Sequence, residues 1–566
     1  MVTRERCLNY AALFLTSSPK NSEPFVKAAY NIRTTYTIRK ILKFKLSNFY
    51  CKSVQIMILY LDVLPLGVSR KQSVREGLRE YQYVLLPGFA WLCLTLSYTV
   101  KANIYADDAL LLKSFEDGNF NTYIREFLYW VPGRNLTIFF QYIIFGVTST
   151  SFPTFGLYHF SAQLLYVCTA GLVGLLTFKL TRSKFLAFII TSFFLFNPLN
   201  IQIINWALAL PQHIIPTLFS IVTVYLLFKP NSRQNEILIM CGLVIMIFTY
   251  DQSAALAFFV ILYCLIPSKS RFFVINFKSS LLFKIFSSAL VFSYFSISYF
   301  GRRTLGYKST LSENSLELLQ KNLIYRPIHN ISQFTEIILG KYAGVASLFG
   351  SISILAILIL CRRSILAQLK QQDVNKIKLC LFFFILSFVS FLPAALWYPN
   401  LRHFFLPTAL MMISIGIFIN DFDLIRNWRS HLLQNLVLAL TFLLVAQLQV
   451  KGLSDWQDRD DIRKDFYLEL SEKMKEYPDQ SNFFIDDSSA PVNDLFYSEW
   501  MPSAYRYYNN FSSASQVRIH QLSKLESLQT CTTSNIDRSF FIEITFNQSN
   551  KNYFNYSVKP LKEICT

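Results

Sequence analysis

Charged residues are scarce in this sequence. Only 16% of the 566 residues are Asp, Glu, Lys or Arg, whereas 53% are hydrophobic and 54 are phenylalanine. A typical soluble domain carries about 25% charged residues and could not bury this much apolar surface. The composition therefore excludes a soluble globule and indicates a polytopic membrane protein.

Metal-ligating patterns are also missing. The six histidines are scattered, and the ten cysteines show no Cys–His spacing typical of a metal site. We expect no cofactor, with a divalent metal as the open alternative. His159 and His213 are interpreted as structural residues at helix ends.

Runs of apolar residues long enough for a bilayer core of about 30 Å predict eleven transmembrane helices. Two further apolar runs, 54–68 and 136–150, are interpreted as helices lying in the membrane interface. The expected spans are 83–100, 155–178, 185–197, 213–228, 236–250, 253–267, 281–300, 337–360, 379–397, 404–420 and 432–450.

The positions of Lys and Arg set the orientation, because such residues near helix ends are retained on the cytoplasmic side. With the N-terminus inside, every short basic loop falls in the cytoplasm, including 179–184, 229–233 and 361–378. Residues 1–82 are then a basic cytoplasmic extension, since 1–49 lack the apolar core and cleavage site of a signal peptide. The alternative for 1–49 is a wrongly assigned start of the reading frame. The basic excess suits anionic lipid headgroups rather than nucleic acid.

The end of the chain has a different composition. Residues 451–566 hold 13 Lys and Arg against 17 Asp and Glu, and they follow the last span. Strand-like stretches at 482–487 and 538–546 and a helix-like stretch at 460–477 predict a small α/β or α+β extracytoplasmic domain. The expected organisation is thus 1–82, a transmembrane domain at 83–450, and a soluble domain at 451–566.

Two adjacent carboxylates, Asp107 and Asp108 in "YADDALLLKSF", follow the first span on the outer side. Ionised groups close to hydrocarbon are costly and tend to be functional. The alternative is helix capping, in which an aspartate accepts backbone N–H bonds at the start of "ALLLKSF". The two roles are compatible, because neighbouring residues on a helix point about 100° apart.

This arrangement resembles a known family. An aspartate pair in the first outer loop, "VPGRN" before an interfacial helix, and the stretch 158–206 are similar to the C-type (GT-C) integral-membrane glycosyltransferases. These include protein O-mannosyltransferases, aminoarabinose transferases and O-antigen glucosyltransferases. The resemblance covers 83–450 and is strongest over 105–206.

The resemblance implies a hexosyltransferase of cell-envelope glycan biosynthesis. It would move a sugar from a polyprenyl-phosphate donor to a glycan, lipid or protein acceptor at the outer face of a bacterial inner or plasma membrane. A phosphate-linked sugar already has a good leaving group, so one carboxylate suffices as the general base. By the resemblance that base is Asp107 or Asp108, with Asp107 preferred, and attack from the opposite face inverts the anomeric centre.

The departing lipid phosphate needs cations at the same membrane edge. Arg402 and His403 lie in the short outer loop "WYPNLRHFFLP", which resembles the Arg-aromatic-Pro segment of the family. Arginine grips phosphate with two parallel N–H bonds, as lysine cannot. The alternative for Arg402 is snorkelling to headgroups. Arg302, Arg303 and Arg134 are weaker candidates for phosphate binding.

Asp251 and Gln252 interrupt two apolar runs that are joined by almost no loop. Their predicted position at the outer boundary makes them candidates for binding a sugar or acceptor hydroxyl. Turn formation is the alternative, given the turn preference of Asp.

A flippase or other transporter of lipid-linked oligosaccharides is the main rival function. Such a protein is expected to show broken helices and ionisable groups near the bilayer midplane, and the sequence predicts neither. A ligase or polymerase of another fold stays open, because it would use the later outer loop at 301–336.

Overall fold

The computed structural model describes residues 81–99, 134–148, 156–206, 209–230, 232–267, 277–304, 374–396, 401–421, 432–474 and 563, together with four strands. The chain divides into two units, Met1–Tyr81 and Gln82–Thr566, and all of the described residues except Tyr81 belong to the second. The predicted interfacial run 54–68, the predicted span 337–360 and the aspartates Asp107 and Asp108 lie outside the described residues.

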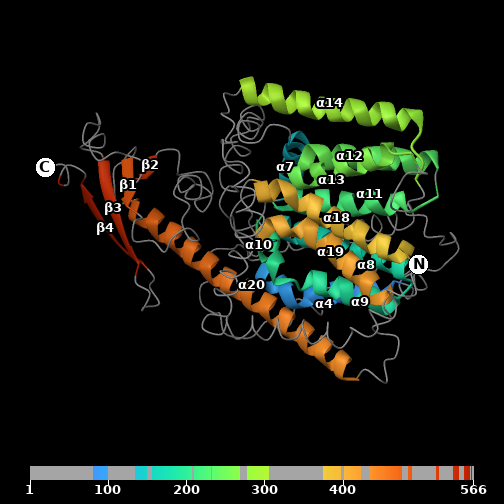
Figure 1. The fold of residues 1–566 in the computed structure, drawn as a ribbon. Coiled ribbons are helices and arrows are strands. Elements are labelled where there is room, and N and C mark those ends of the chain that lie inside the picture. The colour runs from blue at the N-terminus through green and yellow to red at the C-terminus, as the bar shows by residue number, and fades with distance from the viewer. Residues whose placement is uncertain are drawn as a thin grey trace, which may run out of the picture. The chain divides into compact units, whose positions relative to one another are not determined.

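Helices make up the membrane part of the described chain (Figure 1). Each predicted span except 337–360 coincides with a helix. The helices are α4 (Gln82–Thr99), α7 (Asn135–Val147), α8 (Gly156–Thr181), α9 (Lys184–Leu195), α10 (Ile201–Asn205), α11 (Ile215–Leu227), α12 (Arg233–Thr249), α13 (Asp251–Leu265), α14 (Leu281–Thr304), α18 (Val374–Leu396), α19 (Phe405–Asp421) and α20 (Leu432–Met474).

Three short elements complete the helical part. The 3₁₀ turns η1 (Pro198–Asn200) and η6 (Leu401–Phe404) precede α10 and α19, and the π-helical η2 (Leu210–Ile214) leads into α11. Five described helices are long and apolar enough to cross a membrane, or six if the bent pair Lys184–Leu195 and Pro198–Asn205 is one span. The protein is therefore an integral membrane protein, and the full count of eleven spans stays a prediction.

The helices pack in successive layers (Figure 1). In this view α14 lies against α12, followed by α13 and α11, then α18 and α19, then α8, with α9 and α4 beyond. Helix α7 has only 13 residues, about 20 Å, which is too short to cross a bilayer core. It packs instead against α12 and η2.

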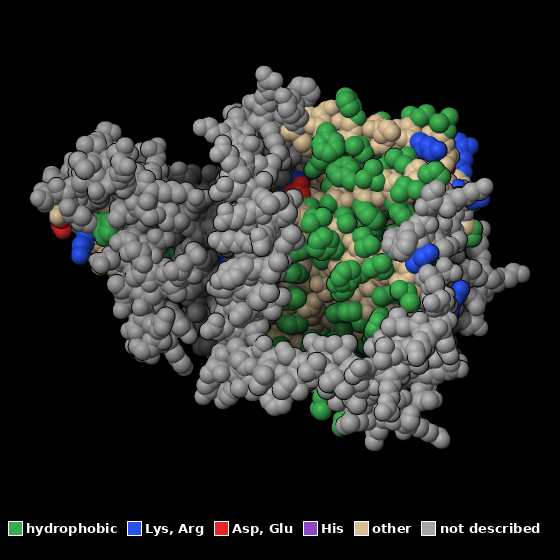
Figure 2. Space-filling view, viewed as in Figure 1, with side chains coloured by type: hydrophobic (Ala, Val, Ile, Leu, Met, Phe, Trp, Pro, Cys, Tyr) green, Lys and Arg blue, Asp and Glu red, His purple; other side chains and the backbone are tan. Residues whose placement is uncertain are grey.

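The chain direction of each helix shows which turns lie at the same end of the bundle. Helix α11 ends at Leu227 and α12 returns from Arg233 to Thr249, so the turn containing Lys229 lies opposite Tyr250. Lys179 in the last turn of α8 is near enough to act electrostatically on Lys229. Figure 2 shows Lys and Arg side chains gathered toward one edge of an apolar face. The basic turns therefore share one end of the bundle.

The described strands form one mixed sheet in the order β2-β1-β3-β4. β1 (Asn482–Asp486) pairs in parallel with β2 (Arg518–Gln521) and with β3 (Ser539–Phe546), and β3 pairs antiparallel with β4 (Phe554–Pro560). β1 and β3 coincide with the two predicted strands, and Phe483 and Ile542 are buried.

The predicted last span and the predicted tail helix are one continuous helix in the structure. α20 runs for 43 residues, so position 450, taken as the end of the transmembrane domain, lies inside it. The sequence contains no proline between Val450 and Met474, and polarity changes there within one unbroken helix. A change of composition therefore does not mark a break in the backbone.

Close approach between α8 and α9 depends on Gly174. A Cβ at this position would collide with the hydroxyl of Thr191 and lie 2.9 Å from Cγ1 of Val84. A Cβ at Gly171, one turn earlier on the same helix, would meet nothing closer than Val84 Cγ1 at 3.9 Å. Small residues allow membrane helices to pack this closely.

We therefore expect Gly174→Ala to destabilise the bundle by about 1–3 kcal/mol, the usual cost of overpacking a well-filled core. The matched variant Gly171→Ala should melt like the wild type. Melting temperatures of the purified protein in detergent measure both effects, and equal melting of the two variants would contradict the packing described.

Candidate functional site

Polar and aromatic side chains from five segments meet at the end of the bundle opposite the basic turns. Arg134 immediately precedes α7, Tyr250 separates α12 from α13, and η6 precedes α19. Each position is a helix terminus, where the chain leaves the apolar part of the bundle. The residues of this polar cluster are Arg134, Gln202, Trp206, His213, Tyr250, Asp251, Gln252, Arg402 and His403.

A single extended residue forms the turn between α12 and α13. Tyr250 has φ −154° and ψ 143°, and Asp251 is the first residue of α13, where the helix dipole favours a carboxylate. The hydroxyl of Ser253 donates to the carbonyls of Met246 and Tyr250, at 2.7 Å each. The Thr137 hydroxyl donates to the Thr249 carbonyl at 2.5 Å and attaches α7 to the same turn.

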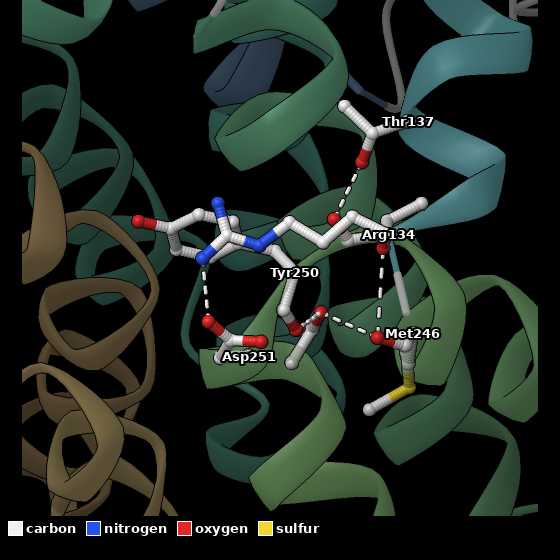
Figure 3. Close-up of polar contacts among 7 residues, drawn as sticks. Arg134, Thr137, Met246, Tyr250 and Asp251 are labelled. Atoms are coloured by element: carbon white, nitrogen blue, oxygen red, sulfur yellow. Dashed lines mark hydrogen bonds and ion pairs between the residues drawn. The ribbon is translucent and has the colours of Figure 1, made fainter. Parts of the chain in front are cut away.

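Arg134 is paired with a carboxylate (Figure 3). Its Nη2 lies 2.5 Å from Oδ2 of Asp251, and its guanidinium carbon lies 4.3 Å from the centre of the Tyr250 ring. Burial alone would lower the pKa of Arg134, but the charge of Asp251 raises it, and the resulting pKa lies above the ordinary value. The guanidinium therefore stays charged.

Arg402 is held differently. Its guanidinium carbon lies 4.2 Å from the centre of the Trp206 ring, a cation–π geometry. Its backbone N–H donates to Oε1 of Gln202 at 3.3 Å, so α10 supports both ends of the residue. In the part of the chain that the structure describes, no carboxylate forms an ion pair with Arg402.

Two imidazole rings and a phenol ring join these arginines. The centre of the His213 ring lies 4.3 Å from that of Tyr250, 5.9 Å from that of Trp206 and 6.0 Å from that of His403. Nε2 of Gln252 donates to the backbone carbonyl of His403 at 2.5 Å. The turn at Tyr250 and the loop at Arg402 therefore lie on two sides of one cluster.

Several nitrogens in this cluster are buried without a hydrogen-bond partner among the described residues. They are Nε of Arg134, Nε of Arg402, Nε1 of Trp206 and Nε2 of His213. Leaving a buried polar group unsatisfied costs about 1–3 kcal/mol. Three of the four are donors in every protonation state, because guanidinium and indole N–H groups cannot accept. The chemistry that would satisfy them is an oxygen-rich, negatively charged group.

The structure brings together five of the residues named from the sequence: Arg134, Asp251, Gln252, Arg402 and His403. Arg302 and Arg303 lie in the last turn of α14, with side chains outside the described part of the chain.

Sequence reasoning missed four members of the cluster, Gln202, Trp206, His213 and Tyr250, and one feature of the fold. His213, interpreted as a structural helix-end residue, lies inside the cluster and is 2% exposed. Trp206 was not singled out. The expectation of no broken helix was wrong at α9 and α10, which are bent by 46° around Pro198. The signal was "FNPLN", since proline after an apolar run ends a helix at the preceding residue.

Comparison with known proteins assigns no family. No family model and no curated protein match the sequence. Among solved structures, the chain is similar to a crystal structure of ArnT from Cupriavidus metallidurans bound to undecaprenyl phosphate. The identity is 9% and the TM-score 0.34, over 83% of this chain and 94% of that chain. Similarity at this level establishes neither a family nor an activity.

Replacing Asp251 by Asn removes the counter-charge of Arg134 and leaves a buried cation. We expect a loss of about 1–3 kcal/mol in stability, less than the ~3–5 kcal/mol of a fully buried pair, because the Asp251 side chain is 44% exposed. Melting in detergent measures the loss. The double variant Arg134→Gln/Asp251→Asn should lose less than the sum of the single variants. Strict additivity would show that the pair does not interact.

Proposed function

We propose that the protein is a membrane glycosyltransferase and that the polar cluster binds the phosphate of a polyprenyl-phosphate sugar donor. The observation that carries the proposal is Arg402, stacked on Trp206 beside a second arginine and without a carboxylate partner among the described residues. An unneutralised guanidinium in such a place has high affinity for an anion, and its planar fork matches phosphate oxygens.

The surroundings of Arg402 suit a lipid phosphate in particular. The cluster stands at helix ends next to apolar helices, where a phosphate at the membrane surface stays attached to a chain in the bilayer. The Trp206 ring covers one face of the Arg402 guanidinium, and shielding a charge from water strengthens its interactions. Arg134 is already balanced by Asp251, which leaves Gln252 and that carboxylate as candidates for binding sugar or acceptor hydroxyls.

The transfer itself would follow from one proton acceptor. A carboxylate takes the proton of the acceptor hydroxyl as its oxygen attacks the anomeric carbon, and the lipid phosphate leaves with the bonding electron pair. Asp107 or Asp108 would be this base, with Asp107 preferred, and the anomeric configuration would invert. No cofactor is required, because the phosphate is the leaving group. A glycan, a lipid or a protein would serve as acceptor.

Arg402→Lys tests the phosphate contact, since it keeps the charge but loses the two-pronged geometry and the stacking on Trp206. A charge-assisted hydrogen bond is worth about 1.5–3 kcal/mol, so donor affinity should fall by about tenfold or more. Titration with farnesyl phosphate, a short isoprenyl phosphate, measures this in detergent. Arg233→Lys, an exposed change at the opposite bundle end, is the control. Equal farnesyl phosphate affinity of both variants and the wild type would indicate that Arg402 extends to the lipid headgroups and does not bind the donor phosphate.

Asp107→Asn and Asp108→Asn test the base. Positioned acid–base catalysis contributes about 10²–10⁴-fold, whereas Asn caps a helix about as well as Asp. We expect one variant to lose that factor in turnover with unchanged melting and donor binding, and the other to stay near wild type. The donor is first identified from lipid-linked glycans that accumulate in cells lacking the protein. Near-normal transfer by both variants would make the aspartates caps and favour the transporter.

A further inference from the structure

The break between α9 and α10 is held by side chains from two other helices, α8 and α20, and by Asn200 within the break itself. Helix α9 ends at Leu195, and the carbonyls of Phe194, Leu195 and Asn197 lie where the regular helical hydrogen bonds stop. Those of Phe194 and Asn197 accept from the backbone N–H groups of Asn197 and Asn200, at 3.4 and 3.0 Å. In an apolar environment such groups need partners within the protein.

Tyr166 of α8 and Asn200 of η1 supply the first side-chain partners of these carbonyls. The Tyr166 hydroxyl lies 3.0 Å from the Phe194 carbonyl and 2.8 Å from the Leu195 carbonyl. Nδ2 of Asn200 donates to the Tyr166 oxygen at 2.9 Å and to the Phe194 carbonyl at 3.0 Å. Both side chains are buried, so water cannot take their place.

Gln449 of α20 completes the set. Its Nε2 donates to the carbonyl of Leu195 at 2.8 Å and to that of Asn197 at 3.1 Å, and its Oε1 accepts from Nε1 of Trp91 in α4 at 3.0 Å. The side chain is fully buried, and every hydrogen-bonding direction but one is used. A single amide therefore joins α4, α20 and the break.

The same break leads directly to the polar cluster. Gln202 follows Asn200 by two residues and supports the backbone of Arg402, and Trp206 at the end of α10 stacks on its guanidinium. Tyr166 also stacks on Phe405, two residues after His403, at 5.7 Å between ring centres. The position of Arg402 thus depends on where α10 lies.

We propose that Gln449 is a positioning residue of the anion site and that it acts through α10 on Trp206 and Arg402. This inference rests on the proposed phosphate binding for its functional consequence. Because α20 continues unbroken from Gln449 to Met474, the amide also connects that helix to the site.

Gln449→Met tests the inference, since methionine has a similar length but cannot form the three hydrogen bonds. We expect faster amide hydrogen exchange in residues 200–206 and 401–404, and a 3- to 30-fold loss of farnesyl phosphate affinity, about the range of coupling through packed networks. Ser414→Ala, which removes a hydrogen bond between α19 and α18 at Cys380, is the matched control and should change neither.

A double-mutant cycle separates positioning from general stability. In the Arg402→Ala background, Gln449→Met should cause no further loss of affinity, because the residue through which it acts is gone. Tyr166→Phe, which removes one hydroxyl and keeps the ring, should act in the same direction and serves if Gln449→Met does not fold. Unchanged exchange in 200–206 for a folded variant, or additive losses in the cycle, would overturn the inference.

Failure of the proposed function gives a different result. If the wild-type protein does not bind farnesyl phosphate, the phosphate assignment is wrong, whereas the exchange measurement still decides whether Gln449 fixes α10. If the wild type binds and Arg402→Ala weakens binding, but Gln449→Met changes neither exchange nor affinity, only the positioning role is wrong.

Discussion

Backbone polar groups inside an apolar bundle must find partners within the protein, and the rest of the site depends on how this requirement is met at one break. Pro198 has no N–H to donate and stops α9 from continuing. The carbonyls released at the break are bonded by Tyr166, Asn200 and Gln449. Because these bonds fix the bend, α10 carries Gln202 and Trp206 to Arg402, where an unbroken helix would carry them past it.

Charge balance explains why the cluster is suited to binding an anion. Two guanidinium groups stand near Tyr250, and one described carboxylate, Asp251, neutralises one of them. Each guanidinium lies against a different aromatic ring. Such contact costs a guanidinium less hydration than it would cost an ammonium group, so an arginine remains charged there. The remaining positive charge lies on Arg402, whose Nε meets no acceptor in the described part of the chain. An oxyanion bound there would neutralise the charge of Arg402 and accept a hydrogen bond from its Nε.

Local pattern predicted the helices and much of the site, and tertiary contact accounts for what it missed. Apolar run length located α8, α11 and α19 to within a few residues, since bilayer thickness sets that length. Arg134, Asp251 and Arg402 were found because charge next to an apolar run is conspicuous. His213 and Trp206 belong to apolar surroundings in sequence, and only the folded bundle places Trp206 against Arg402 and His213 against Trp206 and Tyr250.

The break could be predicted from "FNPLN", but the way it is stabilised could not. Gln449, which bonds its carbonyls, lies about 250 positions away in α20. Nothing local to Gln449 distinguishes it from other polar residues near a helix end. One broken helix does not by itself make a transport pathway through the membrane. In this bundle the bend redirects side chains toward a cluster at helix termini, and the ion pair and the stacked arginine both stand at the end opposite the basic turns. A substrate phosphate bound there would stay at one surface of the membrane, which is the arrangement that a transfer reaction needs.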